Sequence, residues 1–451
     1  MNLLLLTAGA ADMFCGSCLR DNALAAALMA RGHRVSLLPI YTPTVTDEPN
    51  VSAGQRVFLG GISVYLQQHV PLFRHTPWLL DRLWDSASVI KHFASRSIDV
   101  DPHMLGPLTI STLRGERGNQ HKEIDKLLAF LRDEERPDLV NIPNALLIPL
   151  AAPIRRALNR PIVVTLQGED LFLDGLPDPY RTQAIELIRA QIDDVDVFVS
   201  VSEYYTNFMS DYLRIPKARI RTVPLGIDVK AFTPRSDGRD PASHSSPFTI
   251  GYLARIAPEK GLHNLAEAYR LLRRDRGLPA SRLVAAGFLG RSQRAYLTDI
   301  ERKLETCGLL SEFEYVGSVD RADKIRFLHR VDVLSVPSDY VEPKGLYLLE
   351  AMACGVPVVQ PNHGAFPEML QRTGGGILAD SAHPEHIADR IYELWKNPAR
   401  AAALGRQGAE GVRAHYTIDR MADRTLEVYR ELVDNRAGSE PSHQNLSVAS
   451  R

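Results

Sequence analysis

Short apolar segments alternate with helical stretches along most of this 451-residue chain. Segments of this kind are typical of parallel strands that helices cover on both sides. The alternation runs through the first half, is interrupted, and begins again in the second half. The expected strands are 3–6, 35–40, 138–142, 162–166 and 197–201 in the first half and 248–253, 282–286, 313–316, 331–336 and 356–359 in the second; the expected helices include 22–31, 122–132, 344–354 and 418–434.

The alternation predicts an α/β protein with two doubly wound, Rossmann-like domains that face each other across a cleft. The length agrees, because domains usually have roughly 100–200 residues. We place the first domain at residues 1–228 and the second at 229–411. The stretch 234–247 has no apolar period and is expected to be a linker or loop. The small, polar tail 436–451 is expected to be disordered.

Composition argues against several kinds of partner. The chain has 53 Lys and Arg against 54 Asp and Glu, so its charge points neither to nucleic acid nor to a polybasic membrane anchor. No window approaches the roughly 18 consecutive apolar residues of a membrane span. The N-terminal leucines lack the basic segment of a signal sequence and fit a first strand better. Four cysteines make no disulfide framework in a chain of this length, so we expect a reducing, cytoplasmic location.

Two glutamates, Glu342 and Glu350, stand eight positions apart in a segment that reads as strand, loop and helix. The start of such a helix directs unpaired backbone N–H groups and a positive dipole end at the loop, which favours a phosphate. Glu342 lies in the loop and Glu350 lies deeper on the helix. The pair can therefore hold two different parts of one anionic, hydroxyl-rich ligand.

Two cations, Arg255 and Lys260, follow the expected strand 248–253. An arginine offers a planar fork for bidentate phosphate contact, whereas a lysine offers a compact point charge. At the carboxyl end of a strand in a doubly wound domain, the two can neutralise a diphosphate. Taken alone, they are more simply explained as solvated surface residues, as most Arg and Lys are.

The order of these segments resembles the donor half of retaining glycosyltransferases of the "group 1" family (family four), which have the GT-B fold. The resemblance covers nearly the whole second half of the chain, and an ordered set of segments is more specific than any one of them. It is carried by 223–228 (Val-Pro-Leu-Gly-Ile-Asp), 251–261, 286–287, 316–317, 332–338, 342–345 (Glu-Pro-Lys-Gly) and 350–358 (Glu-Ala-Met-Ala-Cys-Gly-Val-Pro-Val).

The resemblance implies an enzyme that moves a hexose from a nucleotide diphosphate sugar, such as a UDP- or GDP-hexose, to an acceptor hydroxyl. The acceptor would be a glycan, a lipid-linked molecule or a small molecule. Anomeric configuration would be retained, and neither a metal nor a cofactor would be required. The first domain would present the acceptor, and a C-terminal helix at 412–435 would cross back to complete that domain.

The resemblance also implies roles for individual residues. Arg255 and Lys260 would bind the diphosphate of the donor, and the backbone N–H groups of Gly345 and Leu346 would complete the anion site. Two cations and a helix N-terminus can stabilise a departing diphosphate without a metal.

Four further residues take roles from the resemblance. Glu350 would bind the ribose, and Glu342 would face the transferred sugar. A carboxylate beside the anomeric carbon can stabilise developing positive charge there. The family's glycine-rich N-terminal loop, which lies against the donor phosphate and the acceptor, would be represented by Gly16 and Ser17.

Cys15 and Cys18 depart from the family pattern at this loop. They are explained as packing or loop-lining cysteines, as a thioredoxin-like redox pair at a helix N-terminus, or, least simply, as metal ligands. A redox protein that uses this pair stays open as a function of the whole chain. Because a fold does not fix function, a non-catalytic nucleotide-sugar-binding protein also stays open, as does, less simply, a phosphorylase or sugar-nucleotide epimerase.

Three other features of the first half carry less specific signals. Gln167 stands where many family members have a histidine, so we assign no role there. Glu169 and Asp170 are explained either as acceptor-side carboxylates or as caps of the following helix. The triplets 99–101 and 194–196 match the Asp-x-Asp pattern of metal-dependent glycosyltransferases of another fold, but such triplets are common by chance.

The stretch 71–93 carries Trp78, Trp84 and Phe93 among basic residues. A helix there would present one apolar face. Docking on the inner face of a membrane would suit a lipid-linked acceptor. A helix packed on the first domain is the simpler interpretation.

Overall fold

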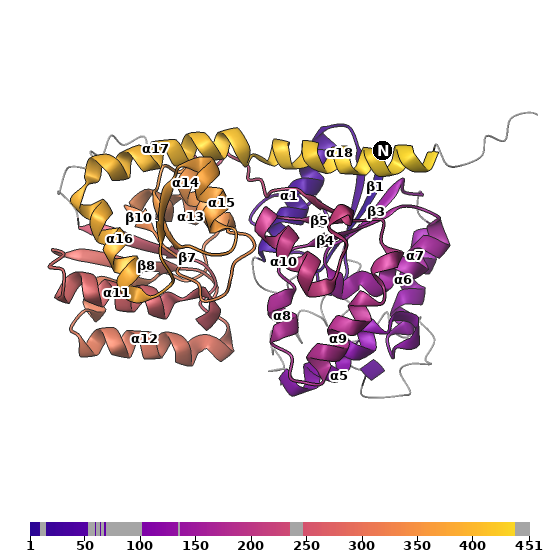
Figure 1. Cartoon of the computed structure of the whole chain (residues 1–451), viewed down its shortest axis with the longest axis horizontal. Coiled ribbons are helices and arrows are strands. Elements are labelled where there is room, and N and C mark those ends of the chain that lie inside the picture. Colours follow the sequence, from indigo (N-terminus) through magenta and orange to yellow (C-terminus); the bar gives the residue numbers. More distant parts are fainter. Residues whose placement is uncertain are drawn as a thin grey trace, which may run out of the picture.

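The computed structural model describes residues 1–9, 15–52, 59, 64, 67–68, 102–133, 136–234 and 247–437. Two parallel sheets of six strands lie side by side along the long axis of the molecule, each with helices against it (Figure 1). This arrangement confirms the predicted fold class of two doubly wound α/β halves. The aromatic stretch 71–93 and the triplet 99–101 lie outside the described residues.

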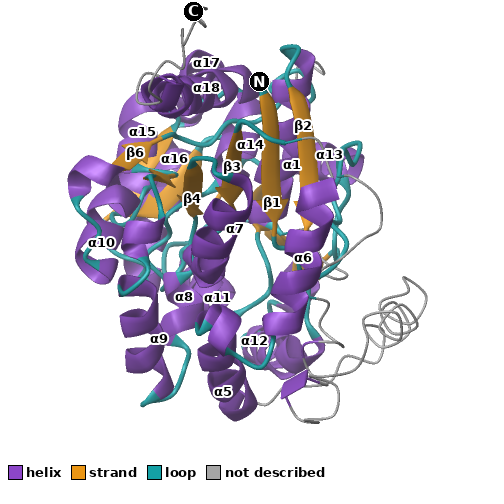
Figure 2. Cartoon of the chain, turned by 90° about the vertical axis from the view of Figure 1, so that its right-hand side faces the viewer, coloured by secondary structure: helices purple, strands orange, loops and turns teal. Residues whose placement is uncertain are grey.

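The first sheet has the strand order β2-β1-β3-β4-β5-β6, and Figure 2 shows β2 and β6 at its opposite edges. Because the strand order reverses beside β1, the loops after β1 and β3 diverge and leave room for a ligand. The strands are β1 (Asn2–Thr7), β2 (Arg34–Pro39), β3 (Leu139–Ile142), β4 (Ile162–Leu166), β5 (Val197–Ser200) and β6 (Ile220–Thr222). The α-helices described in this half are α1 (Gly16–Ala30), α5 (Pro102–Leu113), α6 (His121–Asp133), α7 (Ala151–Leu158), α8 (Asp170–Asp174), α9 (Tyr180–Arg189) and α10 (Glu203–Leu213).

The second sheet repeats this plan with the order β12-β11-β10-β7-β8-β9, and its reversal lies between β7 and β10. The loops that carry Lys260 and Glu342 follow these two strands. The strands are β7 (Phe248–Leu253), β8 (Ser281–Ala286), β9 (Phe313–Tyr315), β10 (Val333–Leu334), β11 (Val358–Pro361) and β12 (Gly376–Ala379). The helices of this half are α11 (Leu262–Arg274), α12 (Arg294–Thr306), α13 (Arg321–Arg330), α14 (Leu346–Ala353), α15 (Phe366–Thr373), α16 (Pro384–Lys396) and α17 (Pro398–His415).

The last helix, α18 (Ile418–Ala437), returns to the first half and packs on α1. In Figure 1, α17 and α18 lie end to end and span both halves. Alternate residues of β1 face opposite sides of the first sheet, and Leu3 and Leu5 belong to the apolar cluster on the α18 side. The residues that α18 adds to this cluster are Met421, Ala422, Leu426, Val428 and Tyr429.

The chain crosses between the halves twice, and the two crossing segments are joined. Ile227 N donates to Tyr416 O (2.9 Å), and Ile418 N donates to Ile227 O (2.9 Å), which forms a parallel bridge between Ile227 and Thr417. A Cβ atom at Gly226 would lie 2.3 Å from Thr417 O, so this close approach requires glycine. The two crossings therefore act as one connection.

Several predicted boundaries need correction. Helix α1 begins at Gly16 rather than at residue 22, which places Gly16 and Ser17 in its first turn instead of in a loop. The expected helix 412–435 is divided, because 412–415 end α17 and α18 begins at Ile418. Residues 235–246 of the expected linker and 438–451 of the expected tail lie outside the described residues, while 436–437 end α18. The domain boundaries at 228 and 411 stay a prediction.

Candidate functional site

Glu342 lies in the loop between β10 and α14, where its carboxylate is buried and paired with Lys260. Burial raises the pKa of Glu342, but the ammonium groups of Lys260 and Lys344 outweigh it, so the pKa lies below its ordinary value. The loop is held from behind, since Ala365 N donates to Glu342 O (2.9 Å). Glu342 is therefore a fixed, ionised carboxylate.

Lys260 ends a short 3₁₀ turn after β7 and is followed by Gly261, which caps α11. Gly261 has φ 71°, and a Cβ atom there would lie 1.8 Å from Pro337 O, so the turn can pack against the Glu342 loop only with glycine. The ammonium of Lys260 also lies 5.6 Å from the centre of the Tyr340 ring. The structure thus brings Lys260 and Glu342 into direct contact.

Arg255 pairs with a different carboxylate from Lys260. Its guanidinium pairs with Glu259 (2.8 Å), and 40% of its side chain is exposed. It does not contact Glu342. Because its stem is long and the partner carboxylate is still 27% exposed to solvent, the guanidinium can turn toward a ligand without leaving a fully buried charge unpaired.

Glu350, on α14, belongs to a buried charge cluster that links the two halves. Lys324 Nζ, on α13, donates to Glu350 Oε1 (2.8 Å) and to Asp47 Oδ2 of the first half (2.9 Å). Arg321, one turn earlier on α13, pairs with Glu48. Burial raises the pKa of Glu350 above its ordinary value although the Lys324 ammonium lowers it. The sequence analysis assigned no role to the other members of this cluster, which are Asp47, Glu48, Arg321 and Lys324.

The first turn of α1 lies against the loop that leads into α14. Lys344 Nζ donates to Ser17 Oγ (3.0 Å), and a Cβ atom at Gly16 would lie 3.5 Å from Leu346 Cδ1. Gly345, which caps α14, has φ 112°, a conformation that favours glycine. Two helix N-termini, of α1 and α14, therefore meet beside Lys344, and both attract anions.

A second interdomain cluster surrounds Asp170 at the start of α8. Tyr205 and Tyr340 both donate hydroxyl hydrogens to its carboxylate, at 2.6 Å and 2.9 Å. Glu169 accepts the backbone N–H groups of Ala145 (2.9 Å) and Gln167 (2.7 Å), so it orders the loop after β4. Burial raises the pKa of both carboxyl groups. Asp170 thus connects the halves, because Tyr340 belongs to the second half.

Replacing Tyr340 with phenylalanine is expected to destabilise the protein by about 1.5–3 kcal/mol, the usual contribution of a hydrogen bond to a charged group. Asp170 would keep only the Tyr205 hydroxyl, and its pKa would rise further because the Tyr340 hydrogen bond lowers it. Urea unfolding measures the change. Tyr392→Phe is the matched control, since that ring stacks on Trp395 within α16; equal losses in both variants would contradict the interdomain role.

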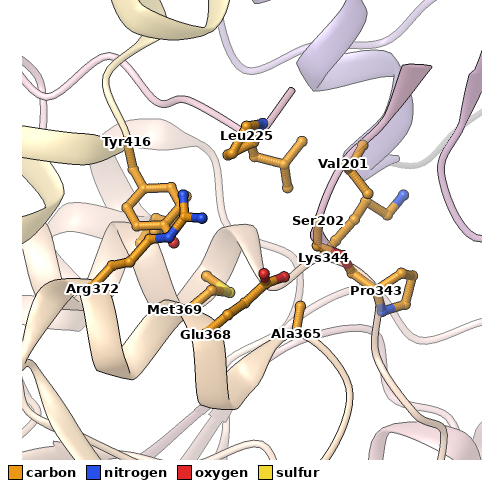
Figure 3. A pocket seen from close by; sticks show the side chains of 12 residues that line it. Val201, Ser202, Leu225, Pro343, Lys344, Ala365, Glu368, Met369, Arg372 and Tyr416 are labelled. Atoms are coloured by element: carbon orange, nitrogen blue, oxygen red, sulfur yellow. The ribbon is translucent and has the colours of Figure 1, made fainter. Parts of the chain in front are cut away.

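A small pocket lies between the halves (Figure 3). Ser202 and Leu225 line it from the first half, and Lys344 and Glu368 from the second. Ser202 Oγ donates to Pro343 O (2.9 Å), so the two halves are in contact at its wall. Glu342, Lys260 and Glu350 do not line this pocket. The pocket therefore does not contain the Lys260–Glu342 pair or Glu350.

Two other expected features have plain structural outcomes. Asp196, from the second Asp-x-Asp triplet, pairs with Arg155 (2.8 Å) and accepts Ile162 N (2.6 Å), so it joins the starts of β4 and β5. Within the described ranges, no three His, Cys, Asp or Glu side chains converge as a metal site would require. None of the helices in that part of the chain has the length and apolarity that a bilayer crossing requires.

Comparison with known families gives two matches that follow one another along the chain. The model of "Glycosyltransferase Family 4" matches residues 107–231, and that of "Glycosyl transferases group 1" matches residues 236–411. The second match contains Arg255, Lys260, Glu342 and Glu350. Together the matches span both halves of the fold.

Two curated relatives are named as enzymes that transfer a sugar. The chain is 28% identical over 299 residues to a GDP-mannose-dependent alpha-(1-6)-phosphatidylinositol monomannoside mannosyltransferase of Mycobacterium tuberculosis. The aligned residues cover 64% of this chain and 73% of the relative. It is 31% identical over 245 residues to a D-inositol 3-phosphate glycosyltransferase of Pseudarthrobacter chlorophenolicus, covering 52% and 55%.

Solved structures share the architecture of the whole chain. A sucrose-phosphate synthase from Thermosynechococcus elongatus superposes with a TM-score of 0.69 at 20% identity, over 96% of this chain and 99% of that one. An Anabaena protein in complex with UDP and glucose gives a TM-score of 0.66 at 16% identity, over 96% and 100%. These similarities establish the GT-B fold, and together with the two family matches they show that the chain belongs to the group 1 glycosyltransferases and is a glycosyltransferase enzyme.

Proposed function

We propose that this enzyme transfers a hexose from a nucleoside diphosphate sugar to an acceptor hydroxyl, with retention of configuration and without a metal ion. The observation that carries the proposal is the buried Lys260–Glu342 ion pair, which lies in the loops after β7 and β10 beside the N-terminus of α14. This arrangement supplies a cation, a dipole and a carboxylate at one point. A leaving diphosphate and a developing positive charge on the sugar need these three groups.

The donor would lie along the second half with its diphosphate at Lys260 and its nucleoside toward Glu350. Backbone N–H groups of Gly345 and Leu346 at the α14 N-terminus would bind phosphate oxygens, and Arg255 would turn from Glu259 to join them. Glu350 would accept ribose hydroxyl hydrogens through its carboxylate, whose ionised form the Lys324 and Arg321 cations favour against burial. Gly16 and Ser17 would contact the phosphates from the first half.

The chemistry follows from where the charges lie. As the bond between the anomeric carbon and the diphosphate lengthens, negative charge grows on the diphosphate beside Lys260 and positive charge grows on the sugar ring beside Glu342. Retention requires the acceptor hydroxyl to approach from the face that the diphosphate leaves. The leaving phosphate oxygen is then placed to take the hydroxyl proton. Closed contacts between the halves would exclude water, which would otherwise hydrolyse the donor.

The acceptor would bind to the first half, in the part of the cleft opposite the donor. Two curated relatives act on inositol-containing acceptors, one of them a phosphatidylinositol mannoside, which supports a polyhydroxyl acceptor that is lipid-linked or glycan in nature. Such an acceptor would place the enzyme in the cytoplasm, at the inner face of a membrane. Transfer of labelled sugar from the nucleotide donor onto acceptor-containing vesicles tests this part of the proposal.

The proposal is tested first by thermal unfolding with UDP, GDP and ADP and their hexose conjugates, each with and without EDTA. We expect one nucleoside diphosphate to raise the unfolding temperature, because a ligand that binds only the folded state stabilises it. EDTA should leave the shift unchanged. No response to any nucleotide would contradict the donor site, and a response that EDTA abolishes would contradict metal independence. Binding without any transfer would favour a non-catalytic sugar-nucleotide-binding protein.

Lys260→Ala is expected to weaken binding of the nucleoside diphosphate by about 10- to 100-fold, the range for one charge-assisted hydrogen bond. Arg255→Ala should weaken it less, since its guanidinium must first leave Glu259. Isothermal titration calorimetry measures both. Arg302→Ala removes a cation whose side chain is 73% exposed and serves as the control. Unchanged affinity in Lys260→Ala would exclude Lys260 from the diphosphate site.

A further inference from the structure

Two cysteines at the start of α1 lie beside the loop of the second half that leads into α14. Cys15 caps α1, and Cys18 lies in its first turn, so the two thiols occupy one face of the helix one turn apart. Both are free. Cys18 is fully buried, whereas Cys15 is partly exposed. This spacing at a helix start allows an intramolecular disulfide.

The surroundings divide the pair into a thiolate and a thiol. The hydrogen bond with the Cys18 thiol lowers the pKa of Cys15 most, and the Lys344 ammonium and nearby backbone N–H groups lower it further, to about 5 despite burial. The same hydrogen bond, together with burial, raises the pKa of Cys18. A nucleophilic thiolate that is partly exposed thus stands beside a protonated, buried partner, which is the order of reactivity that disulfide exchange needs.

The Cys15 thiolate occupies the groups that a donor phosphate would use. Lys344 faces both Cys15 and Ser17, whose hydroxyl accepts its hydrogen bond at 3.0 Å. The backbone N–H groups of Ser17 and Cys18 at the α1 N-terminus are turned to the same sulfur. Because one set of cationic and N–H groups cannot fully satisfy two anions, a thiolate here opposes a phosphate.

We propose that Cys15 and Cys18 form a reversible dithiol–disulfide switch, and that the disulfide state binds the donor diphosphate more tightly than the dithiol state. The identity of the ligand rests on the proposed function. Oxidation would remove the negative charge at Cys15 and leave Lys344 and the α1 N-terminus to the phosphate. The reagent would be a low-molecular-weight disulfide such as oxidised glutathione.

The exchange proceeds in two steps. The Cys15 thiolate attacks one sulfur of oxidised glutathione, the S–S bond breaks, and one glutathione leaves as a thiolate that takes a proton. Cys18 then loses its proton and attacks Cys15 Sγ in the mixed disulfide, which expels the second glutathione. In sum, two protein thiols are oxidised to a disulfide and one oxidised glutathione is reduced to two thiols.

The switch is tested on the full chain with Cys307→Ser, which removes the other partly exposed thiol. The protein is equilibrated in buffers with a series of ratios of reduced to oxidised glutathione. Free thiols are then alkylated, and the mass of the protein is measured by mass spectrometry. We expect a Cys15–Cys18 disulfide to form within the series. Calorimetry with GDP and UDP should then give a dissociation constant about tenfold lower for the disulfide state than for the dithiol state.

Thermodynamic reciprocity provides a second measurement. If oxidation tightens nucleotide binding tenfold, saturating nucleotide must favour the disulfide by the same factor, which is a shift of the midpoint potential by about 30 mV to more negative values. Two cysteines that merely fill space would show no such shift. A midpoint that nucleotide leaves unchanged would overturn the coupling.

Variants separate charge from structure. Cys15→Ser carries neither thiolate nor disulfide, so it should bind nucleotide as tightly as the disulfide state at every glutathione ratio. Cys18→Ser keeps the Cys15 thiolate but cannot form the intramolecular disulfide. This variant should bind the nucleotide weakly under reducing conditions. A pair that stays reduced across the series, or equal affinities in both states, overturns the proposal. If no nucleoside diphosphate binds in either state, both the assigned donor site and its coupling to the disulfide are wrong. The mass measurement still decides whether the disulfide forms.

Discussion

Replacing Glu342 with glutamine is expected to lower the turnover number by a factor of about 100 to 1000, the range for loss of one preorganised electrostatic group. The amide preserves the shape of the side chain but removes the negative charge that would stabilise the sugar in the transition state. Affinity for the nucleoside diphosphate should stay the same or rise, because Lys260 loses its anionic partner. Steady-state kinetics and calorimetry separate the two effects.

Asp339→Asn is the matched control, since this carboxylate lies in the same loop but is 54% exposed. Its turnover should stay near that of the wild type. Acid unfolding adds a second check: because the pKa of Glu342 is depressed below 4.5, its ion pair adds stability above that pH, and the gain is lost as the pH falls through the folded-state pKa. Glu342→Gln should lack this loss. Wild-type turnover in Glu342→Gln would refute the assigned role.

Replacing Lys324 with methionine is expected to destabilise the protein by about 3–5 kcal/mol, the usual effect of removing one partner from a buried ion pair. Glu350 and Asp47 would both remain buried without their shared cation. Glu350 would take up a proton more readily, since Lys324 lowers its pKa more than any other group does. Ribose binding should therefore weaken as well. Urea unfolding measures the stability, and calorimetry compares the nucleoside diphosphate with pyrophosphate.

The loss of affinity should concern the nucleoside diphosphate and spare pyrophosphate, which has no ribose. Arg326→Met, on the same helix with 68% of its side chain exposed, should change stability by no more than about 0.5 kcal/mol. Equal losses for pyrophosphate and nucleotide would show that the variant damages the whole site. Equal stability losses in both variants would show that the charge cluster is not what holds the halves.

The sequence predicts most strands to within about two residues at each end, but it misses the edge strands β6 and β12. The apolar runs 162–166 and 248–253 coincide with β4 and β7, because every strand there is covered on both faces. Strand β12 (Gly376–Ala379) is too short and too rich in small residues to stand out. The α1 start was missed because Cys15 is not a usual capping residue and Gly16 suggests a loop.

The sequence likewise predicts some contacts of the candidate site and misses others. Lys260 and Glu342 are 82 positions apart, yet their contact follows from the adjacency of β7 and β10 in a doubly wound sheet, which the alternation predicts. The link from Glu350 through Lys324 to Asp47 could not be found, because Asp47 comes from the other half of the molecule. That contact depends on how the halves sit together, which no local pattern records.

The return of α18 to the first half has a consequence for synthesis of the chain. The first sheet carries an apolar face, including Leu3 and Leu5, that α18 covers with the last described residues to leave the ribosome. Since domains generally fold from the N-terminus as they emerge, the first half must wait, with part of its core open to water, until the second half has been made. Nascent chains stopped before Ile418 should therefore bind chaperones and aggregate, although all twelve strands of the two described sheets have already been translated.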